Sequence, residues 1–130
     1  PLYMSPEKAL GDSEPDARSD VYSLGAVAYY VLTGSPPFDG DKPMRVILAH
    51  AHDPVVPPSR LRSDVPADLE AVVMRCLAKD PADRYASAAA LREALFECVA
   101  AGGWTHDDAA QWWQSHDVPG DQSEALVSAL

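Results

Sequence analysis

Histidine and cysteine are among the residue types in this sequence that could ligate a metal ion or act as nucleophiles. His50 and His52 are two positions apart, a spacing that places them on different faces of a helix. No further ligands cluster beside them, so the sequence predicts no metal site. Cys76 and Cys98 lie among apolar residues of expected helices. This setting is typical of buried, reduced thiols, with a disulfide as the alternative.

Charged side chains offer a structural chemistry instead. A planar guanidinium such as that of Arg84 can bind a carboxylate such as that of Glu7 at two points. From the residues alone, two unpaired surface charges are the preferred interpretation of Glu7 and Arg84. Asp20 precedes a long apolar run, which indicates a helix cap or a first-turn acid.

Composition excludes some classes of partner. The chain has 130 residues, 47% of them apolar, which fits one small domain with a packed core. It carries 10 basic and 20 acidic residues, a formal net charge of −10, which argues against nucleic acid or an anionic membrane as a partner. No apolar run reaches the ~18–20 residues of a membrane helix, so we expect no membrane contact from this segment.

The residues above must be positioned by helices. Residues 20–32 are apolar on almost every side and end before Gly34, which predicts a central helix surrounded by other elements. Further helices are predicted over 44–51, 67–78 and 87–102. The apolar stripes of these three are Met44, Ile47, Leu48 and Ala51; Leu69, Val72, Val73, Cys76 and Leu77; and Leu91, Leu95 and Val99. Thr105 and Asp108 have the spacing of a capping box for a last helix. The predicted class is mainly α.

Three motifs, taken in order, resemble serine/threonine protein kinases of the bacterial type. Residues 1–7, PLYMSPE, resemble the end of the kinase activation segment. Residues 20–25, DVYSLG, with the later TGSPPF at 33–38, resemble the family's central helix and the loop behind it. Residues 76–85, CLAKDPADRY, resemble its late arginine motif.

The resemblance implies a domain organisation. Residues 1–98 would be a truncated kinase C-lobe, the lower helical part of a two-lobed α+β parent that extends upstream of Pro1. Residues 99–117 would be a helical extension, and 118–130 a polar tail. The extension's tryptophans are expected to pin its helix to the chain's own core; a partner-binding patch is the alternative. They are Trp104, Trp112 and Trp113.

The resemblance also implies roles for particular residues. Glu7 would pair with Arg84 as a structural tie, and Asp20 would hold a catalytic loop that this chain does not contain. The peptide-positioning loop, which binds substrate, would be Pro1, Leu2, Tyr3 and Met4. Tyr3 and Met4 could equally fill the core. Tyr30 stands where many kinases that prefer basic peptides have a glutamate, which argues against that preference.

The sequence contains no glycine-rich loop, strand lysine, His-Arg-Asp or Asp-Phe-Gly motif. No catalytic residue and no cofactor are therefore expected here, and the segment alone should be inactive. ATP and magnesium would belong to the complete parent, with serine or threonine in proteins as substrate and the missing N-terminal part as partner. A cytoplasmic location is expected, with any membrane anchor outside this segment. The alternatives are a pseudokinase and an independent helical binding or scaffold module.

Overall fold

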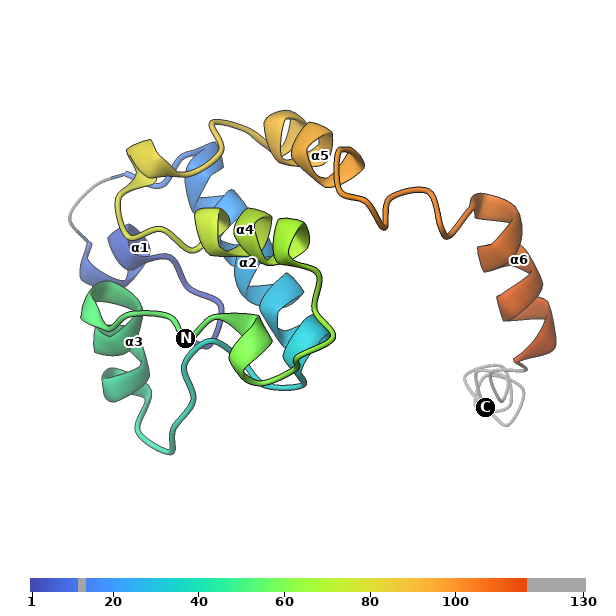
Figure 1. Ribbon diagram of the computed structural model, residues 1–130. Coiled ribbons are helices and arrows are strands. Elements are labelled where there is room, and N and C mark those ends of the chain that lie inside the picture. Colours follow the sequence, from blue (N-terminus) through green and yellow to red (C-terminus); the bar gives the residue numbers. More distant parts are fainter. Residues whose placement is uncertain (12–13, 117–130) are drawn as a thin grey trace, which may run out of the picture. The chain divides into compact units, whose positions relative to one another are not determined.

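The computed structural model describes residues 1–11 and 14–116, and every regular element in these ranges is a helix (Figure 1). The predicted mainly α class is therefore confirmed, while the predicted tail at 118–130 lies outside the described residues. In chain order the elements are α1 (Pro6–Leu10), α2 (Ala17–Thr33), α3 (Pro43–His52), η1 (Pro58–Arg60), α4 (Ala67–Cys76), η2 (Pro81–Asp83), α5 (Ala88–Phe96) and α6 (His106–Ser115). Within the described ranges, none of these helices has the length and apolarity needed to cross a bilayer.

The chain divides into two compact units, Pro1–Ala100 and Ala101–Leu130. The first unit contains α1 to α5, and the second contains α6. Helix α6 begins with the predicted capping box, in which the Thr105 hydroxyl accepts from the Asp108 backbone N–H. Inside this unit the Trp112 ring stacks on the imidazole of His116 at 4.2 Å between ring centroids. The pinning of this helix to the core stays a prediction.

Helix α2 is the central element of the first unit, and it begins earlier than predicted. The Asp16 carboxylate accepts a hydrogen bond from the Arg18 backbone N–H at 2.8 Å, so Asp16 is the N-cap and Asp20 is not. Asp20 instead lies in the first turn, with its carboxylate 3.6 Å from the Lys8 ammonium. The helix ends at Gly34 as predicted, because a φ of 79° suits a residue without a side chain.

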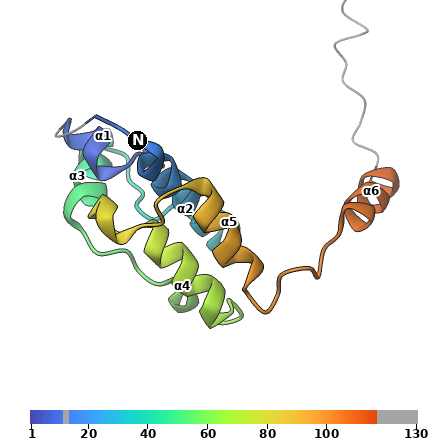
Figure 2. The same ribbon diagram turned by 90° about the horizontal axis from the view of Figure 1, so that it is seen from above.

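Two apolar clusters hold α2 against α4 and α5, which run beside it in both views (Figures 1 and 2). The first joins α2, α4, α5 and the turn after α5, through Val21, Val72, Cys76, Leu91 and Cys98. The second joins α2 and the end of α4, through Tyr22, Ala26, Tyr29, Val73 and Leu77. Both cysteines lie in the first cluster with free thiols, as the sequence predicted. Burial raises the pKa of Cys76 to about 11, which keeps this thiol protonated near neutral pH.

Gly25 marks a close approach of α2 to α4. A Cβ atom placed on Gly25 would lie 2.5 Å from the Cβ of Cys76, and no change of rotamer relieves a contact between two Cβ atoms. We expect Gly25→Ala to destabilise the protein by about 1–3 kcal/mol through overpacking, although alanine is normally the better helix former. Thermal unfolding followed by circular dichroism measures the effect.

Gly40→Ala is the matched control, because a Cβ there would lie 3.7 Å from Val46, an ordinary contact. We expect Gly40→Ala to change stability by less than about 0.5 kcal/mol. A Gly25→Ala variant as stable as the wild type would show that the two helices are not held this closely.

The predicted helix is present as α3, but its predicted apolar stripe is only partly buried: Ile47 and Ala51 are half-buried. The buried residues of α3 are Val46 and His50, whereas Met44 and Leu48 of the predicted stripe are 65% and 46% exposed. The spacing of apolar residues alone favours the side of the helix that carries Met44 and Leu48. The helix instead turns inward a histidine whose two ring nitrogens both find hydrogen-bond partners, which removes the usual penalty for burying them.

Helix α5 begins as predicted but ends early. The Ser87 hydroxyl accepts from the Ala90 backbone N–H at 3.1 Å, and Leu91 is buried. The helix stops at Phe96, and Val99 of the predicted stripe is 93% exposed. The chain turns here because the Asp68 carboxylate accepts from the Val99 backbone N–H at 2.7 Å.

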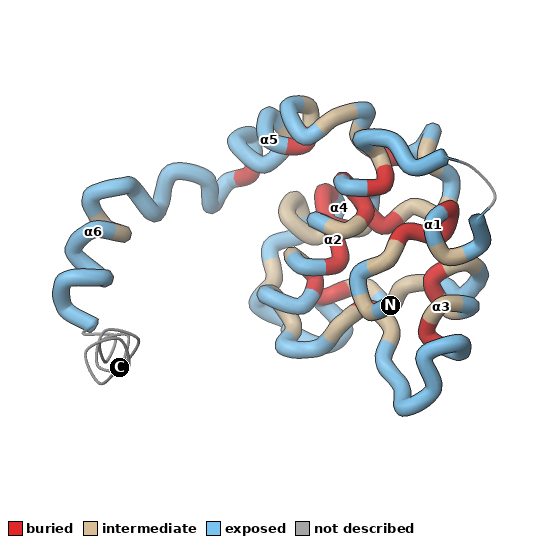
Figure 3. Tube along the Cα trace, turned by 180° about the vertical axis from the view of Figure 1, so that it is seen from behind, coloured by how far each residue is buried: buried red, intermediate tan, exposed pale blue. Residues whose placement is uncertain are grey.

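Among the described residues of the first unit, helix α2 is not surrounded on all sides. Figure 3 shows that α2 carries both buried and exposed residues. Its buried residues pack against α1, α3, α4 and α5, while Leu24, Val27 and Val31 are 49%, 46% and 76% exposed. Such a row of large apolar side chains in water is unfavourable. We call Leu24, Val27 and Val31 the bare face of α2.

Candidate functional site

A buried ion pair joins α1, near the start of the first unit, to the residue that follows η2. Glu7 lies in α1 and Arg84 follows η2, and their side chains are 8% and 0% exposed. The two Nη atoms of Arg84 donate to the two carboxylate oxygens of Glu7 at 2.8 and 2.9 Å. The Ser19 hydroxyl donates to the same carboxylate at 2.6 Å. The Arg84–Glu7 pair therefore has the bidentate geometry that planar guanidinium and carboxylate groups favour.

Arg84 uses all of its N–H donors. Besides the two bonds to Glu7, it donates to the backbone carbonyls of Ala78, Arg18 and Lys79 at 2.8, 3.0 and 3.0 Å. A guanidinium has five N–H groups, so none is left without a partner. This one side chain ties together α1, the start of α2 and the loop after α4, and its role is structural.

The pair fixes the ionisation of Glu7. Burial alone would raise its pKa, but the hydrogen bonds from Arg84 and Ser19 outweigh burial and lower the pKa from 4.5 to about 2. A carboxyl group whose pKa is lower in the folded state stabilises the fold above its unfolded pKa. This stabilisation is therefore complete above about pH 4.5 and is lost as the pH falls toward 2.

Two buried serines beside the pair should respond oppositely to the same substitution. The Ser5 hydroxyl is fully buried and has no hydrogen-bond partner, whereas the Ser19 hydroxyl donates to Glu7. We expect Ser5→Ala to leave stability unchanged or raise it by about 1 kcal/mol, because it removes an unsatisfied polar atom. Ser19→Ala should cost about 1.5–3 kcal/mol, the range for a hydrogen bond to a charged group.

Thermal unfolding of the two single variants measures the difference. Each variant serves as the control for the other, because both remove one buried hydroxyl group. Equal losses of stability would contradict this description of the site.

The loop predicted to position the substrate, residues 1–4, lies on the surface next to α2 and α3. Pro1 and Tyr3 are exposed, and Leu2 and Met4 are half-buried. The Met4 backbone N–H donates to the Pro1 carbonyl at 3.3 Å, and the Ser23 hydroxyl of α2 donates to the Tyr3 carbonyl at 2.8 Å. The loop therefore presents two side chains outward on an ordered backbone.

The role of His50 at this loop could not be predicted from the sequence, because its partners are distant along the chain. Its imidazole is fully buried, with Nε2 3.0 Å from the Leu2 carbonyl and Nδ1 2.7 Å from the Tyr22 hydroxyl. A carbonyl only accepts, so Nε2 carries the proton and Nδ1 accepts from Tyr22. Burial, assisted by the nearby charge of Lys79 and opposed by the Leu2 hydrogen bond, lowers the pKa of His50 to about 4. The ring is thus neutral at physiological pH.

The remaining predicted residues lie apart from the ion pair. Asp20 is exposed on the first turn of α2 and contacts Lys8. The side chain of Tyr30, on α2, is 46% exposed. The structure thus brings Glu7 and Arg84 together, while Asp20 pairs with Lys8 instead.

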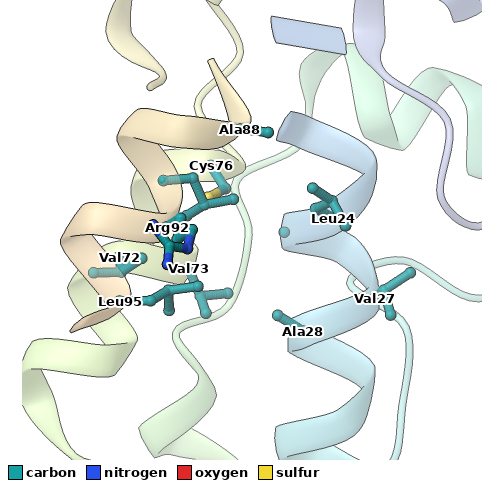
Figure 4. Close-up of a pocket in the computed structure, with 11 residues that line it drawn as sticks. Leu24, Val27, Ala28, Val72, Val73, Cys76, Ala88, Arg92 and Leu95 are labelled. Atoms are coloured by element: carbon teal, nitrogen blue, oxygen red, sulfur yellow. The ribbon is translucent and has the colours of Figure 1, made fainter. Parts of the chain in front are cut away.

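Two pockets accompany these features. An apolar pocket of about 390 Å³ lies between α2 on one side and α4 and α5 on the other (Figure 4). A polar pocket of about 480 Å³ beside α3 mixes acids and bases, among them Asp39, Asp53 and Arg45. In residues 1–11 and 14–116, no group of three or more metal-ligating side chains is gathered.

Comparison with known proteins places most of the chain in one family. The model for the protein kinase domain matches residues 1–96. The serine/threonine-protein kinase PknB of Mycobacterium tuberculosis (strain ATCC 25177 / H37Ra) is 55% identical over 93 residues, which are 72% of this chain and 15% of that protein. Pkn1 of Myxococcus xanthus is 48% identical over 95 residues, 73% of this chain and 14% of Pkn1. PksC of Streptomyces coelicolor is 42% identical over 99 residues, 76% of this chain and 17% of PksC. The chain thus spans only about a sixth of these relatives.

Proposed function

The chain belongs to the protein kinase domain family, and from that membership we propose that it forms the lower, helical part of the C-lobe of a serine/threonine protein kinase. The observation that carries this proposal is the buried pair of Glu7 and Arg84, which joins the Ser-Pro-Glu helix to the late arginine motif. The relatives PknB, Pkn1 and PksC are all serine/threonine-protein kinases, which supports this specificity.

The proposed C-lobe part is residues 1–98, followed by a helical extension at 99–117 and a polar tail at 118–130. The end of the family match at residue 96 and the end of α5 at Phe96 support the first boundary. The capping box of Thr105 supports a separate helix in the extension.

The proposed role of this part is that of a platform for protein substrates. Pro1, Leu2, Tyr3 and Met4 receive the peptide next to the serine or threonine that is phosphorylated. The hydrogen bonds from Ser23 and His50 to this loop support the role, because a loop that selects peptides must keep one conformation. Tyr30 supplies no carboxylate, so this platform does not recognise a basic peptide through that position.

The phosphoryl-transfer groups belong to the rest of the complete protein. ATP and magnesium bind there, because the sequence lacks the motifs that hold them in kinases. The bare face of α2 supports a contact with that missing part, since an apolar face of this kind is stable only when covered. We assign this segment to the cytoplasm, where ATP is available. Asp20, exposed at the start of α2, is free to accept hydrogen bonds from a catalytic loop supplied by that part.

Reading the gene upstream of Pro1 tests the proposal. A kinase requires a His-Arg-Asp motif with its downstream asparagine and an Asp-Phe-Gly motif in the same frame. Replacement of these aspartates would identify a pseudokinase that acts as a binding module. A reading frame that opens near Pro1 would instead favour an independent helical scaffold.

A further inference from the structure

Two side chains, one from α2 and one from α3, form hydrogen bonds with the backbone of the loop at residues 1–4. Ser23 of α2 binds the Tyr3 carbonyl, and His50 of α3 binds the Leu2 carbonyl. Ser23 is on the helix adjacent to the loop, whereas His50 reaches it from an element 48 positions further along the chain. The loop conformation therefore depends on where α3 places this imidazole.

The imidazole is fixed on every side. The Tyr22 hydroxyl donates to Nδ1, and the rings of Tyr22 and Phe38 meet it edge-on at 5.7 and 5.0 Å between centroids. The ammonium of Lys79 donates to the His50 backbone carbonyl at 2.8 Å and lies 4.6 Å from the centre of the Phe38 ring. With its backbone and both ring nitrogens bound, His50 has one orientation and one tautomer available.

The same contacts connect the loop to the ion pair. The Arg84 guanidinium lies over the Tyr22 ring, 4.9 Å from its centre, while Nη1 and Nη2 hold Glu7. A continuous set of contacts thus runs from Glu7 through Arg84, Tyr22 and His50 to the Leu2 carbonyl. The ion pair and the loop are neighbours in one network.

We propose that His50 is a positioning residue for substrate peptide: its Nε2–H fixes the Leu2 carbonyl and so sets the shape in which residues 1–4 meet the peptide. A purely packing role would be served by an apolar ring, without burying two polar nitrogens. Burial keeps the ring neutral, and the two matched hydrogen bonds aim it at one acceptor. This inference rests on the proposed kinase function, and its test separates the two.

The test compares His50→Phe, His50→Gln and Tyr29→Phe in the complete protein. Phenylalanine keeps a ring but has no donor, whereas the glutamine amide can donate to the Leu2 carbonyl. Tyr29→Phe is the matched control, because it removes a buried hydroxyl that donates to the Val56 carbonyl at 2.8 Å, away from the loop. The readouts are KM for a peptide substrate, KM for ATP, kcat, and hydrogen exchange of the loop amides.

We expect His50→Phe to raise the KM for peptide and the exchange rate of the loop amides by about tenfold, the upper range for one hydrogen bond. The KM for ATP and kcat should change less than about twofold, and His50→Gln should recover part of the loss. Tyr29→Phe should leave the peptide KM and loop exchange unchanged.

If His50→Phe matches Tyr29→Phe in both readouts, the inference is overturned. If the wild-type protein transfers no phosphate, the proposed function fails, while loop exchange still decides the role of His50. If His50→Phe does not fold, loop exchange in His50→Gln and Tyr22→Phe decides it: faster exchange in Tyr22→Phe than in His50→Gln supports the inference, and unchanged exchange in both overturns it.

Discussion

Replacing Arg84 with alanine is expected to destabilise the kinase domain by about 3–5 kcal/mol, the cost of leaving one partner of a buried ion pair alone. The Glu7 carboxylate would lose two hydrogen bonds in a site where it is 8% exposed, and three backbone carbonyls would lose their donor. Thermal unfolding of the complete protein should show a fall of about 10 °C in the transition of this domain.

The control for Arg84 is an ion pair of similar geometry on the surface. Arg62 lies 3.0 Å from Asp64, but the two side chains are 56% and 69% exposed. Arg62→Ala should therefore change stability by less than about 1 kcal/mol. Glu7→Gln should also remove the loss of stability that the wild type shows as the pH falls from about 4.5 toward 2. Equal effects of Arg84→Ala and Arg62→Ala would rule out a structural role for the buried pair.

Placing a charge on the bare face of α2 is expected to affect the complete protein and the 130-residue chain differently. Val27 is 46% exposed in the chain, so Val27→Asp should cost the isolated chain less than about 1 kcal/mol. In the complete protein, where we propose that other elements cover this face, the same carboxylate is buried without a partner. The expected loss there is several kcal/mol, enough to prevent stable folding.

Leu48→Asp is the matched control for this experiment. Leu48 is also 46% exposed, but it lies on α3, outside the bare face. Thermal unfolding and size measurement of both variants, in both proteins, give the comparison. If Val27→Asp were as mild as Leu48→Asp in the complete protein, no element would cover α2 at this position.

The sequence predicted those features that depend on local pattern. The stop at Gly34, the cap at Ser87 and the capping box of Thr105 each need only a few neighbouring residues, and all three were predicted correctly. The inward face of α3 was not, because the burial of His50 depends on Tyr22 and on the Leu2 carbonyl, which are distant in sequence.

The pair of Glu7 and Arg84 illustrates the same limit. Nothing in the local pattern around either residue distinguishes them from two surface charges, and only the resemblance to kinases suggested that they meet. The hydrogen bonds from Arg84 to three backbone carbonyls could not be predicted from any motif, because they depend on how the loop after α4 folds back on α2. Likewise Asp16 displaced Asp20 as the cap because α2 begins earlier than its apolar run.

An assay of phosphoryl transfer by the complete protein tests most directly whether this chain is part of a serine/threonine protein kinase. The purified protein would be incubated with labelled ATP, magnesium and a peptide containing serine, threonine and tyrosine, and the phosphorylated amino acids would then be identified. We expect phosphoserine or phosphothreonine from the complete protein and no transfer from the 130-residue chain alone. Phosphotyrosine as the main product, or no transfer by a folded complete protein, would contradict it.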